Sequence, residues 1–135
     1  MSQKTSHLEL IQAVIHRMSV NSFQLKGWTV VLVSALFALA AAKTENDFAA
    51  LAYFPALAFW ILDGYFLHQE RKFRSLYDHV RTLSEEEIDF SMDASSCDRS
   101  SWIRSLFSPT LVIFHGVVFA SIVLVMVALR GNSGG

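Results

Sequence analysis

The sequence predicts an all-α integral membrane protein, a single domain of residues 1–135 with three transmembrane helices and a helical-hairpin extension in the cytoplasm. Two observations predict this fold class. Hydrophobic residues make up 53% of the chain and charged residues only 17%, whereas an ordinary soluble domain has about 25% charged residues. The apolar residues also lie in three long blocks, and a chain this small cannot bury that much apolar surface in a core of its own.

The three apolar blocks are the expected membrane spans, since one crossing needs roughly 20 largely apolar residues. They cover residues 27–42, 48–68 and 109–129. The first block is short, and the residues before it complete the crossing in the interface. The second contains Pro55, which membrane helices tolerate. The third begins with Ser108 and Pro109, a capping residue followed by proline at the first helical position.

Helical periodicity continues beyond the first two blocks. Residues 43–47 form a short polar link, which predicts an antiparallel hairpin. Residues 5–26 carry apolar side chains at helical spacing, which predicts one continuous helix from about Thr5 to Ala42. A similar apolar stripe runs through residues 69–83. We therefore expect the two extensions to pack against each other as a stalk beneath the membrane.

The connection formed by residues 84–108 is expected to hold loops and short helices. Ser84 followed three residues later by Glu87 is a capping-box pattern. This pattern predicts that the stalk helix ends near Leu83 and that a short acidic helix follows it.

The second half of this connection leads into the third span. Residues 93–100 have the composition of a loop. They include the only cysteine, Cys97, which forms neither an internal disulfide nor a CxxC metal site and is expected to be a reduced cytosolic thiol. Residues 102–107 combine aromatic, apolar and basic side chains, which predicts a short helix at the membrane interface.

Lysine and arginine residues predict the orientation, because cytoplasmic segments carry an excess of them. Nine lie before the first span or between the second and third: Lys4, Arg17, Lys26, Arg71, Lys72, Arg74, Arg81, Arg99 and Arg104. Only Lys43 and Arg130 lie on the other side. The N-terminus and residues 69–108 are therefore expected in the cytoplasm, and the C-terminus on the outer side of the membrane.

Small residues predict where the spans approach each other. In the first span Ser34, Ala38 and Ala42 lie four residues apart, and in the second span Ala52 and Ala56 do. Such small-xxx-small faces let membrane helices approach closely. Alanine is also common throughout these blocks, so the alternative that the spacing carries no packing information stays open.

One acidic residue lies inside an expected span. Asp63 follows Asp47 by 16 residues. Lys26 precedes Lys43 by 17 residues, so Asp63 and Lys26 lie at nearly equal distances from the hairpin link. Because a charge in the membrane is costly unless it is paired, we expect a contact between them, and His115 lies at a similar depth in the third span. The sequence thus predicts an intramembrane polar cluster of Lys26, Asp63 and His115; the alternative is that Lys26 and Asp63 reach the headgroups independently.

A basic run after the second span predicts an anionic ligand. Arg71, Lys72 and Arg74 lie close together, with Arg81 further along. One interpretation is lipid headgroups, which basic clusters next to membranes commonly bind. Another is a nucleotide or oligonucleotide, because arginine makes bidentate phosphate contacts and a ring of copies would multiply them. Salt bridges with the acidic run 85–89 are the third; duplex DNA is not expected.

The sequence contains no catalytic signature. HExxH, GxSxG, P-loop and GxGxxG motifs are absent from it. Its histidines are scattered and show no spacing typical of metal ligands. We therefore expect that the protein is not an enzyme and that it has neither a bound metal nor a cofactor.

Several phrases of the sequence resemble a family of small bacterial membrane proteins. They are HLELIQAVIHRM, LKGW and VSALFALAA, followed by FW, LDGYFLHQERKFRSLYDHVR and EEEIDFSMD, within residues 7–93. The chain is similar to the small transmembrane effectors of bacterial anti-phage systems, and among them to the channel subunit that accompanies a nucleotidyltransferase in Hailong systems. The resemblance implies a homo-oligomeric channel that depolarises the inner membrane and that a nucleotide-derived ligand holds shut.

These predictions favour a homo-oligomeric ion channel or pore-forming effector, gated from the cytoplasm by an anionic, nucleotide-like ligand. Its expected ligand-binding residues are Arg71, Lys72, Arg74 and Arg81. Three spans are too few to enclose a permeation path, so the expected partners are the bilayer and further copies of the chain. The resemblance implies, in addition, a nucleotide or oligonucleotide ligand made by a partner nucleotidyltransferase at the bacterial inner membrane, with the C-terminus in the periplasm. The alternative is a non-conducting membrane anchor or sensor that recruits a soluble partner through its stalk. Its docking face would be Phe73, Leu76, Tyr77 and Val80.

Overall fold

The computed structural model describes residues 2–43, 46–95 and 101–134, and within them it contains helices and no strand. The helices are α1 (Gln3–Lys43), α2 (Asn46–Leu51), α3 (Tyr53–Arg81), α4 (Trp102–Leu106) and α5 (Pro109–Ser133), with one 3₁₀ turn, η1, at Glu85–Glu87. Three helical stretches, α1, α2 with α3, and α5, are long and apolar enough to cross a membrane. The predicted all-α class with three candidate spans is therefore confirmed.

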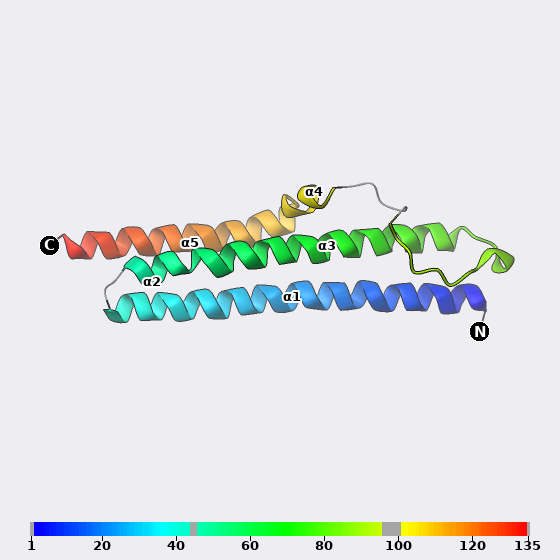
Figure 1. The fold of residues 1–135 in the computed structure, drawn as a ribbon, viewed down its shortest axis with the longest axis horizontal. Helices are drawn as coiled ribbons and strands as arrows, with labels where there is room; N and C mark the ends of the chain where they lie inside the picture. Colours follow the sequence, from blue (N-terminus) through cyan, green and yellow to red (C-terminus); the bar gives the residue numbers. More distant parts are fainter. Residues whose placement is uncertain (1, 44–45, 96–100, 135) are drawn as a thin grey trace.

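The long helices form a hairpin to which a third helix is added along half its length. Figure 1 shows α1 antiparallel to α2 and α3, with α5 lying beside the half of the hairpin that contains α2. We call this half the bundle. The other half, which contains the N-terminus of α1 and the C-terminus of α3, has no third helix, and we call it the stalk. α1 is one continuous helix of 41 residues, as predicted, and at 1.5 Å per residue it is about 60 Å long.

The second candidate span is interrupted near its start. α2 ends at Leu51, Ala52 forms a turn whose N–H donates to the Ala49 carbonyl, 3.1 Å away, and α3 begins at Tyr53. Pro55 explains the break, because proline has no N–H to donate to the carbonyl four residues earlier, that of Leu51, and its ring collides with that carbonyl. The sequence predicted a proline-containing span but not this separate first turn.

The bundle core combines side chains from all three spans. It consists of Val33, Ala52, Ala56, Val118 and Ile122. Small side chains of the second span, Ala52 in the turn before α3 and Ala56 on α3, therefore do face the other helices, as predicted.

The small residues predicted as the contact face of α1 are, in contrast, exposed. Ser34, Ala38 and Ala42 lie outside the bundle core. The buried residues of α1 are His7, Ile11, Ile15, Thr29, Val33 and Ala40. At 100° per residue these fall on one side of a straight helix, and the three small residues lie on the opposite side. The prediction for α1 is therefore wrong, because the apolar stripe fixes which face of the rod meets its partners.

The stalk has an apolar core of its own. Ile11 and Ile15 from α1 and Leu76 and Val80 from α3 are buried against one another, together with Ala94 from the segment that follows α3. The predicted packing of the two helical extensions is therefore present. Burial of large apolar side chains at about 1.5–3 kcal/mol each is what holds such a hairpin together.

A segment that the sequence predicted only as loops and short helices packs along the stalk. We call residues 84–95 the strap. α3 ends at Arg81, two residues before the predicted position, and the capping pair is present because the Ser84 N–H donates to Glu87 Oε2 at 3.0 Å. Glu85 Oε1 then accepts a hydrogen bond from the Gln3 backbone N–H at 2.5 Å. This places a carboxylate at the N-terminus of α1, where negative charge is stabilising. The apolar residues of the strap, among them Ala94, pack into the stalk core. The strap therefore holds α1 and α3 together.

α4 packs against the junction of stalk and bundle at a glycine of α3. A Cβ at Gly64 would overlap Leu106 Cδ2 and would lie 3.0 Å from Cγ and 3.5 Å from the backbone Cα of Leu106. Next to this contact the Trp60 indole N–H donates to the Leu106 carbonyl at 3.1 Å. Gly64 therefore allows α4 to lie directly on α3.

Gly64→Val is expected to reduce the free energy of unfolding in detergent by about 1–3 kcal/mol, because a branched side chain has to displace α4. The matched control is Gly116→Val on α5, where an added Cβ meets nothing within 4 Å. Denaturant titration of both variants, followed by circular dichroism, checks the prediction. If the two variants were equally stable, Gly64 would not be the position that fixes α4.

Candidate functional site: a buried charge cluster

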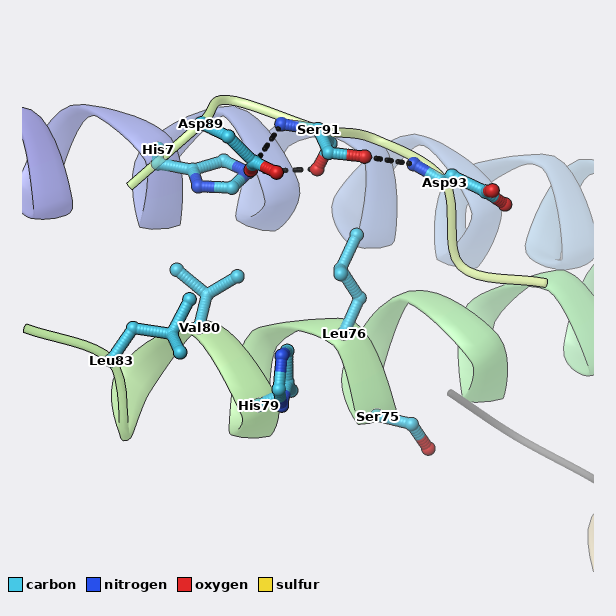
Figure 2. Close-up of a pocket in the computed structure, with 9 residues that line it drawn as sticks. All are labelled: His7, Ser75, Leu76, His79, Val80, Leu83, Asp89, Ser91 and Asp93. Carbon is cyan, nitrogen blue, oxygen red and sulfur yellow. Dashed lines mark hydrogen bonds between the residues drawn. The ribbon is translucent and has the colours of Figure 1, made fainter. Parts of the chain in front are cut away.

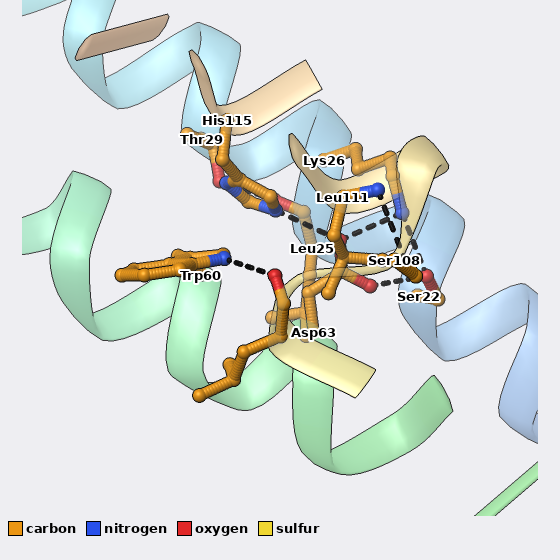
Figure 3. Close-up of polar contacts among 10 residues, drawn as sticks. Ser22, Leu25, Lys26, Thr29, Trp60, Asp63, Ser108, Leu111 and His115 are labelled. Atoms are coloured by element: carbon orange, nitrogen blue, oxygen red, sulfur yellow. Dashed lines mark hydrogen bonds and ion pairs between the residues drawn. The ribbon is translucent and has the colours of Figure 1, made fainter. Parts of the chain in front are cut away.

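Three titratable side chains, one from each long helix, meet inside the molecule. Figure 3 shows Lys26 of α1, Asp63 of α3 and His115 of α5 converging on one point. Lys26 Nζ lies 2.7 Å from Asp63 Oδ2, and His115 Nε2 lies 2.8 Å from the same oxygen. The predicted contact between Lys26 and Asp63 is present, and His115 belongs to the same cluster.

A serine completes the cluster and was missed by the sequence reasoning. Ser22 Oγ donates to Asp63 Oδ1, and it accepts from Lys26 Nζ at 2.8 Å. Both carboxylate oxygens of Asp63 are therefore hydrogen-bonded. Ser22 is four residues before Lys26, one turn along the same face of α1, so the signal was present in the spacing.

The cluster is removed from solvent. Asp63 is completely buried, His115 is 2% exposed, and the Lys26 side chain is 18% exposed. Lys26 Nζ also lies 5.9 Å from the centre of the Phe114 ring, within range of a cation–π interaction. A buried ion pair adds little stability over an apolar core, but removing one partner leaves an uncompensated charge and is strongly destabilising.

His115 has one ring nitrogen that the cluster does not use. A charged Asp63 carboxylate only accepts hydrogen bonds, so Nε2 of His115 carries the proton it donates. Nδ1 is buried and, within the described part of the chain, has no hydrogen-bond partner. An imidazole bonded on one side to a carboxylate has its second nitrogen available for a proton or another donor. Nδ1 of His115 is therefore a buried ring nitrogen that a further polar group could contact.

A groove between α1 and α5 reaches the cluster. It has a volume of about 710 Å³, and Lys26 is among its lining residues. Most of the remaining wall is apolar, but the hydroxyls of Ser34, Thr110 and Ser121 also line it. The charge cluster therefore borders a surface of the bundle and is not sealed between the helices.

The four predicted ligand-binding residues lie on α3 of the stalk, but not on one face. Arg74 pairs with Glu70 at 2.7 Å, and Arg81 pairs with Asp78 at 3.5 Å, both on the surface. At 100° per residue Arg71 falls close to Arg74 and Arg81. Lys72 falls toward the strap, where it is close enough to Asp93 to influence that carboxylate. The set is thus three arginines on one face and a lysine on another.

Two expectations about the stalk are wrong. The acidic run 85–89 was one candidate partner for the basic residues, but Arg74 and Arg81 pair with acids of their own helix, and Glu85 instead contacts the N-terminus of α1. The face proposed for docking a soluble partner is also occupied. Leu76 and Val80 are buried, and Phe73 and Tyr77 pack beside them, against α1 and the strap. The stripe stabilises the hairpin and is not free to recruit a partner.

Within the described ranges no group of three or more His, Cys, Asp or Glu side chains lies close enough to hold a metal ion. Cys97 and Arg99 lie outside the described residues. The prediction of a reduced thiol at Cys97 and the use of Arg99 in predicting the orientation therefore concern residues that the structure does not describe.

Comparison of the chain with protein-family models, with curated proteins and with solved structures finds no match. The resemblance to anti-phage membrane effectors therefore stays a prediction from the sequence phrases.

Proposed function

We propose that this protein is a homo-oligomeric ion channel of the bacterial inner membrane, gated from the cytoplasm by an anionic, nucleotide-like ligand and acting in anti-phage defence. The observation that carries the proposal is the buried cluster of Lys26, Asp63 and His115 within helices that are long enough to cross a membrane. Ionisable groups inside a membrane are costly, and they mark ion pathways and relays far more often than they serve packing.

Several copies are needed for conduction. The centre of the bundle is filled by apolar side chains such as Val33, Val118 and Ile122, so a path through a single copy has no room. In the most apolar window of each candidate span, only 17%, 22% and 22% of the residues are buried by the chain itself. The remaining apolar surface is available to lipid and to neighbouring copies, and the groove beside Lys26 lies on it.

The orientation follows from the positive residues. Nine lysine and arginine residues were predicted to be cytoplasmic. Most of them lie on the N-terminal half of α1 and on residues 69–81 of α3. These two segments lie side by side at the same end of the molecule (Figure 1), which supports placing the stalk in the cytoplasm. The C-terminus of α5 then lies in the periplasm.

The basic face of the stalk supports a ligand of the opposite charge. Leu76 and Val80 turn toward α1, and at 100° per residue Arg71, Arg74 and Arg81 fall on other sides of α3. Arg74 lies beside α1, where it lines a pocket with Gln12 and Ile15, and we propose that the three arginines face the axis of a ring of copies. In the pairs Arg74–Glu70 and Arg81–Asp78, both arginine side chains and Asp78 are exposed, whereas Glu70 is only 12% exposed. Ion pairs of exposed side chains are worth about 0–1 kcal/mol. A phosphate-rich ligand that makes bidentate contacts to several arginines can therefore displace these acids.

Current through planar bilayers that contain the purified protein tests the proposal. We expect discrete current steps that a short oligonucleotide suppresses when it is added on the stalk side. Replacing Arg71, Arg74 and Arg81 by glutamine is expected to weaken suppression by more than tenfold and to leave the current intact. The matched control removes the same charge elsewhere, through glutamine at Lys4, Arg17 and Lys72.

Two outcomes would count against the proposal. Protein that never passes current, with or without the oligonucleotide, would favour the non-conducting anchor or sensor, as would a monomeric mass in detergent. Equal loss of suppression in the arginine variant and in its control would show that the ligand responds to total charge and not to this face of α3.

A further inference from the structure

The stalk contains a second polar site, on a different face from the arginines. A pocket of about 460 Å³ lies between α3, the N-terminal part of α1 and the strap. Figure 2 shows Leu76 and Val80 on α3 and Leu83 just after its end on one side of the pocket, with His7, Asp89 and Asp93 above them. The pocket therefore has an apolar floor and a polar rim.

His7 supplies an unused hydrogen-bond acceptor. Its side chain is completely buried, and Nε2 lies 2.9 Å from the carbonyl oxygen of Ser91 in the strap. Because a carbonyl only accepts, Nε2 carries the proton, and Nδ1 of the neutral ring is an acceptor. Nδ1 is buried and, among the described residues, has no hydrogen-bond partner. In Figure 2 the ring reaches from α1 into the space above Val80.

The rim carries two carboxylates. Asp89 Oδ1 accepts from the Ser91 backbone N–H at 3.0 Å. Asp93 Oδ1 accepts from the hydroxyl of Ser95 at 2.5 Å and from its backbone N–H at 3.0 Å. These hydrogen bonds from Ser95 hold the pKa of Asp93 below its usual value of 3.8, with a smaller contribution from Lys72. The two carboxylates lie on the rim of the pocket, so the pocket favours a ligand with positive charge.

The acids and imidazoles of this pocket do not form a metal site. Within the described part of the chain, no three of the usual ligand side chains converge closely enough for an ion. The apolar floor is also unsuited to a hydrated metal ion, whereas it can hold the hydrocarbon or aromatic body of an organic molecule. The chemistry of the walls thus points to a ligand with N–H donors on an apolar body.

We propose that this pocket binds a small organic cation, an amidine, guanidine or amine attached to a flat apolar group. Its N–H groups donate to the Asp89 carboxylate and to Nδ1 of His7, while the Asp93 carboxylate adds negative charge at the rim. Its apolar body lies on Leu76 and Val80. The proposal rests on the pocket alone and holds whether or not the protein conducts ions.

Such a ligand would tie the strap to the stalk. Asp89 and Asp93 belong to the strap, whereas the apolar floor belongs to α3. A molecule that contacts both stabilises the closed arrangement, since a ligand that binds only the folded form shifts the equilibrium toward it. Hydrogen exchange of the strap amides should therefore slow when the pocket is occupied.

The test uses the full-length protein in detergent and three probes of nearly the same shape. Benzamidine is a cation, benzamide is neutral and benzoate is an anion. Isothermal titration calorimetry is expected to show that benzamidine binds at least tenfold more tightly than either of the others. Asp89→Asn is expected to weaken benzamidine binding by about tenfold, through loss of a charge-assisted contact, and Asp93→Asn by a smaller factor, through loss of negative charge at the rim. Asp78→Asn, an exposed acid of α3 outside the pocket, should leave it unchanged.

The proposal fails if benzamide or benzoate binds as tightly as benzamidine. It also fails if both aspartate variants keep the wild-type affinity, or if bound benzamidine leaves exchange of the strap amides unchanged. Asp89 and Asp93 are exposed, so their amide variants should retain the fold, which circular dichroism checks. The three probes on the unaltered protein give an answer that depends on no variant.

Discussion

Asp63→Asn is expected to lower the free energy of unfolding of the protein in detergent by about 3 kcal/mol. The amide keeps the shape of the side chain and an oxygen for Ser22 or His115 to donate to, but it leaves the Lys26 ammonium without a counter-ion. Breaking a buried pair by removing one partner costs about 3–5 kcal/mol, and the 18% exposure of the Lys26 side chain places this case at the lower end. Denaturant titration followed by circular dichroism measures the change.

A double variant separates the effect of the lost charge on stability from the effect of altered packing. Lys26→Met in the Asp63→Asn background removes the unpaired ammonium, so the double variant is expected to recover most of the lost stability. Asp78→Asn is the matched control, since its partner Arg81 lies 3.5 Å away and both are exposed; its effect should stay within about 0.5 kcal/mol. A double variant no more stable than Asp63→Asn would mean that Lys26 and Asp63 do not act as a pair.

Leu76→Ala is expected to separate the stalk from the strap while the bundle stays folded. Leu76 is 4% exposed and lies in the stalk core with Ile11, Ile15 and Val80, and truncating a buried leucine costs about 2–5 kcal/mol. The stalk core is small and separate from the bundle core, so it has little to offset this loss. Hydrogen exchange should rise over residues 69–95 and stay slow in the bundle.

Leu10→Ala is the control, since it removes the same atoms from a leucine of the stalk that is 51% exposed. Limited proteolysis gives an independent readout, because cleavage within the strap requires that it leave the stalk. Equal protection of the strap in the two leucine variants would show that the apolar contact of Leu76 does not hold it.

The charge cluster could be predicted because it depends on counting alone. A five-residue link makes two straight helices antiparallel, so residues equally far from it, here Lys26 and Asp63, must lie side by side. Regular helix geometry also predicted the length of α1 and the packing of Ile11 and Ile15 against α3. These features arise from helix geometry and from a hydrophobic stripe, which are both local properties of the sequence.

Other features could not be predicted because they depend on contacts between distant segments. The path of the strap is fixed by the bond of Ser91 to His7, 84 residues away, and by Glu85 at the start of α1, and no short-range pattern announces either contact. The small residues Ser34 and Ala38 predicted the wrong face of α1 for contact with the bundle. In a straight helix the apolar side chains that are buried in the stalk and in the bundle lie on the same side. The groove beside Lys26 depends on how far α5 stands from α1, which the sequence does not encode locally.

Because α1 is one unbroken helix, a displacement at one of its ends moves the other end as well. Its first turn is held by Glu85, and its other end carries residues of the candidate first span. Because a helix resists bending, a tilt of about 5° at the strap would carry the far end of a 60 Å rod sideways by roughly 5 Å. Release of the Glu85 carboxylate from the N-terminal tip is therefore transmitted along the whole helix, past the Lys26–Asp63 pair near its middle.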